Sequence, residues 1–232
     1  MEGLAEMARI FELDRRLATT VSKQRDAGRF PLVIASNCIS SVGTVGGCGD
    51  GRRLGVVWLD AHADFDVPED NLSGFSDVMG LSILTGSAWQ ALRRTDPDFE
   101  LVSEHNVVLA GARDLAAYQR DRLAGSKLTV VRGRIDSDEF ADAVRCLRDH
   151  VDRVYLHVDL DVLDTGAGHA NAYAAPGAPS LNAVLDRIRQ TFSTFHVCAA
   201  AITAYDPACD PNGQILRAAQ EIAATIGSAS RC

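Results

Sequence analysis

The sequence predicts an α/β fold: a single domain, residues 1–232, in which helices cover both faces of a doubly wound, mostly parallel sheet. Short apolar runs recur along the chain, they are apolar almost without interruption, and helical patterns separate them. Continuous apolar runs are typical of strands that are buried on both faces. A regular alternation of such strands with helices favours parallel pairing through helical crossovers.

The expected elements follow from the N-terminus in order. Apolar residues at helical spacing predict a helix over residues 2–29, which Pro31 terminates. The expected strands are the apolar runs at 31–36, 54–59, 106–111, 127–131, 153–160 and 195–202. The later helices are expected at 115–125, 137–151, 181–192 and 213–227. Two long irregular stretches remain, 61–79 and 164–179, and loops of this length in a compact domain usually carry function.

The composition restricts the classes of partner. The 31 acidic residues outnumber the 23 basic ones and give a formal net charge of −8, so a nucleic acid, which needs a basic face, is not an expected partner. No apolar run approaches the roughly 20 residues of a membrane span. The first residues mix charged and apolar side chains and do not resemble a signal peptide. Because the six cysteines also lack CxxC spacing, we expect a reduced, cytoplasmic protein that contacts no membrane.

Acidic and imidazole side chains gather at the carboxyl ends of two of the predicted strands, 54–59 and 153–160. These side chains are Asp60, His62, Asp64, Asp159 and Asp161. In open parallel sheets ligands bind beyond the carboxyl ends of the strands, and i, i+2 spacing in an extended segment places side chains on the same side. Buried carboxylates so close together repel one another unless a cation lies between them. Acids that merely cap loops rarely occur in such a pattern, which indicates a site for divalent cations such as Mn²⁺.

With these motifs the chain resembles the arginase/agmatinase/formiminoglutamase superfamily, which are binuclear manganese ureohydrolases. The motifs are Asp60-Ala61-His62-Ala63-Asp64 and Asp159-Leu160-Asp161-Val162-Leu163-Asp164, with weaker support from Ser73-Gly74, Gly111-Ala112-Arg113-Asp114 and Tyr205-Asp206-Pro207. The resemblance covers residues 31–228 and implies an arginase-like fold. Family members usually carry two more strands before the segment that matches 35–38. The chain is therefore either a shortened member or a sequence that lacks part of the protein.

The resemblance also implies the ligands of two Mn²⁺ ions. They would be Cys38, Asp60, His62, Asp64, Asp159 and Asp161. Asp60 and Asp159 would bridge both ions, and Cys38 stands where the family has a histidine. A thiolate can ligate a borderline metal and would shift the preference towards Zn²⁺, Fe²⁺ or Co²⁺. A small buried cysteine without a metal is an equally good interpretation of this position.

The implied chemistry is hydrolysis by a metal-activated water. Asp64 would hold the proton of the attacking hydroxide and later protonate the departing amine. Asp77 occupies the position of the family's proton-shuttling histidine. His157 lies two residues before Asp159 and therefore points to the same side, where it is either a support for a ligand or, as we prefer, a core histidine.

The expected substrate contacts depart in part from the family pattern. Ser73 matches a serine that contacts substrate, whereas Asp66 replaces an asparagine that contacts the substrate carboxylate. Ala204 replaces the glutamate that pairs with the guanidinium, a role for which Asp206 could substitute. His169, in a glycine-rich loop, is a further candidate because of its location. These departures favour a cationic or modified guanidino substrate over L-arginine.

The leading hypothesis is an arginase-like amidinohydrolase that cleaves a C–N bond, not a peptide bond, of a guanidino or amidine compound and releases urea or an analogue. One alternative is a formimino- or amide hydrolase on the same scaffold. Another is a metal-poor pseudoenzyme that acts by binding or assembly, which the residues at Cys38, Asp77 and Ala204 favour. The expected partner is a small molecule, and family members are commonly homo-oligomers.

Overall fold

The computed structural model describes most of the chain. The described residues are 2–49, 53–71, 74–95, 99–131, 135, 137–163, 166, 168–177 and 179–231. Their strands are β1 (Leu32–Ile34), β2 (Leu54–Leu59), β3 (Val107–Ala110), β4 (Thr129–Val131), β5 (Arg153–Asp159) and β6 (His196–Thr203). They form one six-stranded sheet in the order β1-β6-β5-β2-β3-β4, and every neighbouring pair is parallel. The predicted parallel α/β sheet is confirmed.

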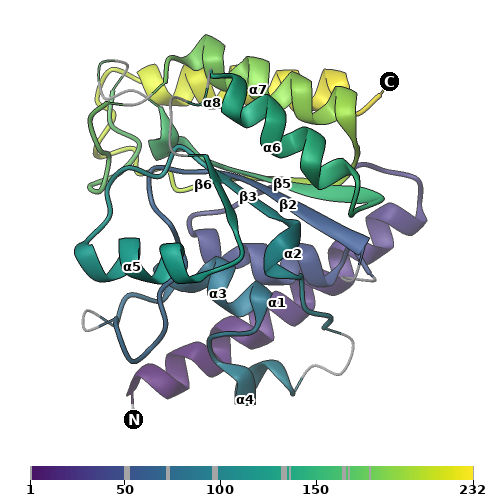
Figure 1. The fold of residues 1–232 in the computed structure, drawn as a ribbon, viewed down its shortest axis with the longest axis vertical. Coiled ribbons are helices and arrows are strands. Elements are labelled where there is room, and N and C mark those ends of the chain that lie inside the picture. The colour runs from purple at the N-terminus through teal and green to yellow at the C-terminus, as the bar shows by residue number, and fades with distance from the viewer. Residues whose placement is uncertain are drawn as a thin grey trace.

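Helices cover both faces of this sheet, as expected for a doubly wound fold (Figure 1). The helices are α1 (Glu2–Asp26), α2 (Ser41–Gly46), α3 (Gly80–Thr85), α4 (Gln90–Arg93), α5 (Ala117–Gly125), α6 (Asp138–Arg148), α7 (Leu181–Thr194) and α8 (Gln214–Ala229). One face carries α6, α7 and α8, and the other carries α1, α2, α3 and α5. Within the described residues, none of the helices combines the length and the apolar character needed to cross a bilayer.

The strand side chains divide between two cores by simple alternation. In β2, Val57 and Leu59 pack towards α6–α8, whereas Val56 and Trp58 pack towards α1–α3. All six β2 residues are buried, which explains why the run is apolar throughout. The same alternation in β5 places Tyr155 in the α1–α3 core, and His157, two residues on, lies on the same face.

Two details differ from the sequence-based expectation. The first helix ends at Asp26, three residues early, because Gly28 turns the chain with a left-handed φ of +69°. The second detail is a group of short helices, α2, α3 and α4, that the periodicity did not indicate. Each has four to six residues, too few to show a helical repeat in sequence.

Helix α2 packs unusually close to α1, and glycines make this possible. A Cβ atom at Gly43 would lie 2.6 Å from the backbone oxygen of Asp14, a distance that real Cβ atoms do not show. We expect Gly43→Ala to lower the free energy of unfolding by about 1–3 kcal/mol, the usual range for overpacking. Urea denaturation of the purified chain measures it.

Gly227 in α8 is the matched control, because a Cβ atom there meets no atom of the described residues within 4 Å. Gly227→Ala should raise the free energy of unfolding by up to about 1 kcal/mol, since alanine favours helix. Equal responses of the two variants would show that the α1–α2 approach does not limit side-chain size.

Candidate metal centre

Three neighbouring strands deliver polar side chains to one edge of the sheet. Asp60 directly follows β2, Asp159 ends β5 and Thr203 ends β6. In the parallel register Leu59 lies opposite Val158, and Asp159 lies opposite Thr203. The residues after these strand ends therefore meet, as the carboxyl edge of a parallel sheet requires.

Local hydrogen bonds fix the two central carboxylates. Asp60 Oδ1 accepts the backbone N–H of His62 at 2.7 Å, and Asp60 Oδ2 accepts the indole N–H of Trp58 at 2.8 Å. Asp159 Oδ1 accepts the backbone N–H of Asp161 at 2.8 Å. In both motifs the first acid therefore holds the turn that presents the residue two positions later.

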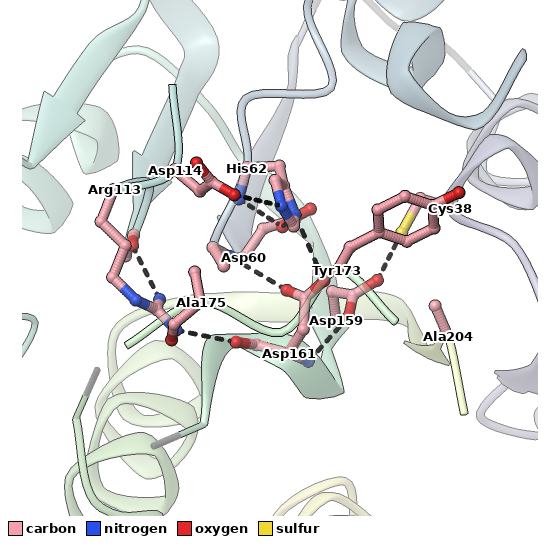
Figure 2. Close-up of polar contacts among 12 residues, drawn as sticks. Cys38, Asp60, His62, Arg113, Asp114, Asp159, Asp161, Tyr173, Ala175 and Ala204 are labelled. Atoms are coloured by element: carbon pink, nitrogen blue, oxygen red, sulfur yellow. Dashed lines mark hydrogen bonds and ion pairs between the residues drawn. The ribbon is translucent and has the colours of Figure 1, made fainter. Parts of the chain in front are cut away.

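His62 points towards the acids from both motifs (Figure 2). Its Nδ1 lies 3.2 Å from Asp161 Oδ2 and 3.5 Å from Asp60 Oδ1. Arg113 stabilises the surrounding loops, since its guanidinium donates to the backbone oxygens of Asp161 and Ala175, each at 2.9 Å.

Cys38 opens the short 3₁₀ helix Cys38–Ser40 after β1 and is buried beside Asp159. Its thiol donates to Asp159 Oδ2 at 2.8 Å. Thr203 Oγ1 lies 3.0 Å from the same sulfur, and His157 Nε2 lies 3.2 Å from it. The cysteine that replaces the family histidine thus lies among the predicted ligands.

Asp64 and Asp77 are two further buried acids at this site. Asp64 has a left-handed φ of +46°, which is rare outside glycine and turns its backbone oxygen to accept the N–H of Leu81 at 2.8 Å. Asp77 lies in the 3₁₀ helix Ser76–Met79, and its Oδ1 accepts the backbone N–H of Ile39 at 2.7 Å.

Without a cation, these buried acids oppose one another electrostatically. Burial, together with the charges of neighbouring carboxylates, raises the pKa values of Asp60, Asp64 and Asp159 above the ordinary range. Burial raises the pKa of Asp77 to about 6, although the hydrogen bond from the backbone N–H of Ile39 acts in the opposite direction and lowers it. Burial alone would lower the pKa of His62, but Asp161 and Asp60 raise it to about 11.

The donor atoms fit divalent metal ions. Two groups of possible ligand atoms converge, each with all its atoms within 4.8 Å of one another. The groups are Cys38, Asp60, His157 and Asp159, and Asp60, His62 and Asp161. Because Asp60 belongs to both, the described side chains have the form of two adjoining sites with a shared carboxylate. The Asp64 carboxylate lies beside the groups and belongs to neither.

A cavity of about 170 Å³ opens above these groups. Its floor contains the acids described above, and its rim includes two aromatic side chains from distant loops, Phe75 and Tyr173. Their rings stack, with centroids 5.6 Å apart and planes at 26°. Among the described residues that line the cavity, none is a lysine or an arginine.

Some of the predicted site residues line this cavity and others do not. Those that line it are Cys38, Asp60, His62, Asp64, Asp77, Asp159, Asp161 and Asp206. Asp66 is turned towards α5 instead, where its carboxylate accepts hydrogen bonds from Tyr118 and Gln119. His169 is exposed and lies outside the described lining, and Ser73 lies outside the described residues. The roles of all these residues stay predictions.

The sequence analysis missed several contributors. Trp58 lies two residues before Asp60, so the same i, i+2 argument that located His157 would have found it. Asn171 lies in the same glycine-rich loop as His169, which made it a candidate by location alone, and it donates to Asp161 Oδ2 at 3.3 Å and to the backbone oxygen of Ala204 at 3.2 Å. Tyr173 likewise lies in an irregular loop without a pattern.

Known arginases are similar to this chain in sequence. The arginase from Staphylococcus aureus (strain COL) is 31% identical over 170 residues, which are 70% of this chain and 56% of that protein. The arginase from Brevibacillus brevis is 33% identical over 162 residues, 67% of this chain and 54% of the relative. The aligned part of this chain thus spans little more than half the length of these relatives.

Solved structures show the same fold. The crystal structure of arginase from Bacillus cereus superposes with a TM-score of 0.86 at 23% identity and covers 95% of this chain and 78% of that one. The formimidoylglutamase from Bacillus subtilis gives a TM-score of 0.76 at 17% identity, with 95% and 65% coverage. The model of the arginase family matches residues 5–227, nearly the whole sequence. With the sheet order, the two acidic motifs and these matches in agreement, the chain belongs to the arginase family.

Proposed function

We propose that this chain is a metal-dependent amidinohydrolase that cleaves a C–N bond of a cationic guanidino or amidine compound and releases urea or a urea analogue. The observation that carries the proposal is the pair of ligand groups sharing Asp60 on the floor of a cavity. Family resemblance supports Mn²⁺ as the ion and assembly into homo-oligomers.

The residues that would hold the ions are Cys38, Asp60, His62, Asp159 and Asp161, with Asp64 beside them. Divalent ions at such a site supply Lewis acidity and lower the pKa of water, which makes a nucleophile available at neutral pH. Asp60 belongs to both groups and Asp159 to the first, and both buried carboxylates orient the residue two positions later through the hydrogen bonds described above.

Two further acids are placed to move protons. Asp64 lines the cavity, where its carboxylate would take a proton from water and return it to the departing amine. Asp77, with a pKa raised by burial to about 6, exchanges protons with solvent near neutral pH. Its Oδ1 stays fixed on the N–H of Ile39.

The charge of the cavity selects the substrate class. The floor is acidic, and no lysine or arginine is found among the described lining residues to pair with a substrate carboxylate. The carboxylate of Asp206 lies at the same cavity and would repel such a group. A guanidinium or amidinium with a cationic or neutral tail therefore fits better than an amino acid.

Urea release from a panel of guanidino compounds tests the proposal. With metal-loaded protein we expect kcat/KM for the decarboxylated amine analogue of arginine to exceed that for L-arginine at least about 10-fold, since one unfavourable charge contact of about 1.4 kcal/mol has this effect. Protein treated with a chelator is the control and should be inactive.

The other outcomes separate the alternatives. Formamide or ammonia release from a formimino or amide compound, without urea from any guanidino compound, would replace the proposal by the formimino- or amide hydrolase. Failure to bind metal after loading with Mn²⁺ or Zn²⁺, together with no turnover, would leave the pseudoenzyme.

A further inference from the structure

We propose that His157 is a metal ligand and that, with Cys38, it forms a thiolate–imidazole site that prefers Zn²⁺ to Mn²⁺. The inference rests on the metal centre of the proposed function but not on the identity of the substrate. It assigns the two ligand groups to different kinds of ion: a softer one at Cys38 and His157, and a harder one at His62 and Asp161.

The first support is the convergence of ligand atoms. The possible ligand atoms of Cys38, Asp60, His157 and Asp159 all lie within 4.8 Å of one another, and all four residues are buried. The set contains one sulfur, one ring nitrogen and two carboxylates, whereas the Asp64 carboxylate, the acid that family resemblance places here, is not among these mutually close atoms. His157 occupies the place in the group that the resemblance gives to Asp64.

The second support is the fixed orientation of the imidazole. The ring of His157 stacks on Trp58 with centroids 3.6 Å apart and planes at 11°. Its Nδ1 lies 2.8 Å from the hydroxyl of Tyr155, which leaves Nε2 directed at Cys38. A second nitrogen held by a buried hydrogen-bonding group is the usual arrangement of a metal-bound histidine, because it fixes both tautomer and ring orientation.

The same atoms serve as a hydrogen-bond network when no ion is bound. The Cys38 thiol has a single proton, yet Asp159 Oδ2, Thr203 Oγ1 and His157 Nε2 lie within 2.8–3.2 Å of its sulfur. When the thiol proton is lost to solvent and the imidazole proton is on Nδ1 facing Tyr155, sulfur and Nε2 become two electron-pair donors 3.2 Å apart, with Thr203 Oγ1 3.1 Å from Nε2.

The distances allow an ion with a small adjustment. Zinc bonds of about 2.3 Å to sulfur and about 2.0–2.1 Å to nitrogen at a tetrahedral angle separate the two ligand atoms by about 3.5 Å. Sulfur and Nε2 are 3.2 Å apart, so binding needs them to move apart by only a few tenths of an ångström. Thiolate and imidazole together are typical ligands of zinc, whereas manganese prefers oxygen.

Metal affinities of the chain test the inference. After removal of metal by a chelator, Zn²⁺ and Mn²⁺ are titrated separately in competition with an indicator. We expect the wild type to bind one Zn²⁺ ion at least about 100-fold more tightly than any Mn²⁺ ion. His157→Asn should weaken Zn²⁺ binding at least about 100-fold, which is more than the usual effect of losing a residue that only orients a ligand. The weaker Mn²⁺ site at His62 should change less, because His157 is not among its ligand atoms although the two groups share Asp60.

His150→Asn is the matched control, because His150 is an exposed histidine after α6. It should leave both affinities unchanged. Zinc affinity retained in His157→Asn would overturn the inference, and so would a wild-type preference for Mn²⁺ at both sites.

A measurement on the wild-type chain tests the same site without requiring that the His157→Asn variant folds. Co²⁺ added to the metal-free chain should give the near-ultraviolet absorption of a thiolate–cobalt bond, and Cys38→Ser should lose it. Binding of Co²⁺ without this band would overturn the thiolate–imidazole site while leaving a carboxylate metal centre and the proposed hydrolase intact. No metal binding at all would overturn both.

Discussion

Asp159→Ala is expected to abolish metal binding and turnover together. Asp159 is buried at the end of β5 and lies 2.8 Å from the Cys38 sulfur, and its other oxygen holds the turn to Asp161. Its removal therefore disturbs both ligand groups. Elemental analysis should find a fall from about two ions per chain to fewer than one. Because the metal contributes several kcal/mol to such reactions, kcat/KM should fall at least about 1,000-fold.

Asp186→Ala is the control, because Asp186 is an exposed acid on α7 that pairs with Arg189 of its own helix. Metal content and kcat/KM should stay as in the wild type. Turnover retained in Asp159→Ala, at unchanged metal content, would contradict the assignment of Asp159 as a ligand.

A different substitution at this position, Asp159→Asn, is expected to stabilise the folded protein when no metal is bound. Burial raises the pKa of Asp159 well above its usual range, so the ionised carboxylate destabilises the folded chain at neutral pH. Asp159→Asn keeps an acceptor for the N–H of Asp161 but cannot ionise. In chelator the variant should therefore unfold at higher urea concentration than the wild type at pH 7.5, even though it binds metal less well. Unfolding at the same or a lower concentration would contradict this account.

Asp14→Asn is expected to stabilise the protein at alkaline pH. Asp14 is buried on the side of α1 that packs against α2, and its Oδ2 has no hydrogen-bond partner among the residues that the structure describes. Burial raises the pKa of Asp14 from its ordinary value of 3.8 to about 7, although a hydrogen bond from the backbone N–H of Gly43 lowers it in part. The folded chain then binds more protons than the unfolded chain between about pH 4 and 7, so stability falls as the pH rises through this window.

The size of the effect follows from the shift. A pKa shift of about three units corresponds to a difference of at most about 4 kcal/mol in the free energy of unfolding between Asp14→Asn and the wild type. This difference should be present above pH 7.5 and vanish below about pH 4. Urea denaturation of variant and wild type at both pH values measures it. Asp26→Asn, at the exposed end of α1, should show a difference that changes little with pH. A difference for Asp14→Asn that does not depend on pH would contradict a titrating buried carboxyl.

The sequence predicted the sheet well because burial on both faces leaves a direct signature. The run at 54–59 became β2 without a change of boundary, since every one of its side chains is buried. The short helices α2 to α4 left no such signature, because their burial depends on α1 and the sheet rather than on their own periodicity.

The candidate site was predictable to the extent that local spacing determines it. Asp60, His62, Asp159 and Asp161 lie within two short motifs, and the strand order brings the motifs together. The approach of Cys38 to His157 could not be predicted, because it joins residues 119 positions apart. The stacking of Phe75 on Tyr173 depends in the same way on the meeting of two loops.

The aromatic rim and the acidic floor of the cavity belong to different kinds of element. The floor acids sit at strand ends or in turns held by backbone hydrogen bonds, whereas Phe75 and Tyr173 extend from irregular loops. Loops accept substitution and insertion more easily than buried strands do. Natural variation or directed evolution can therefore alter which molecules enter the cavity while the candidate metal centre stays intact, and Phe75 and Tyr173 are the positions at which to begin such a library.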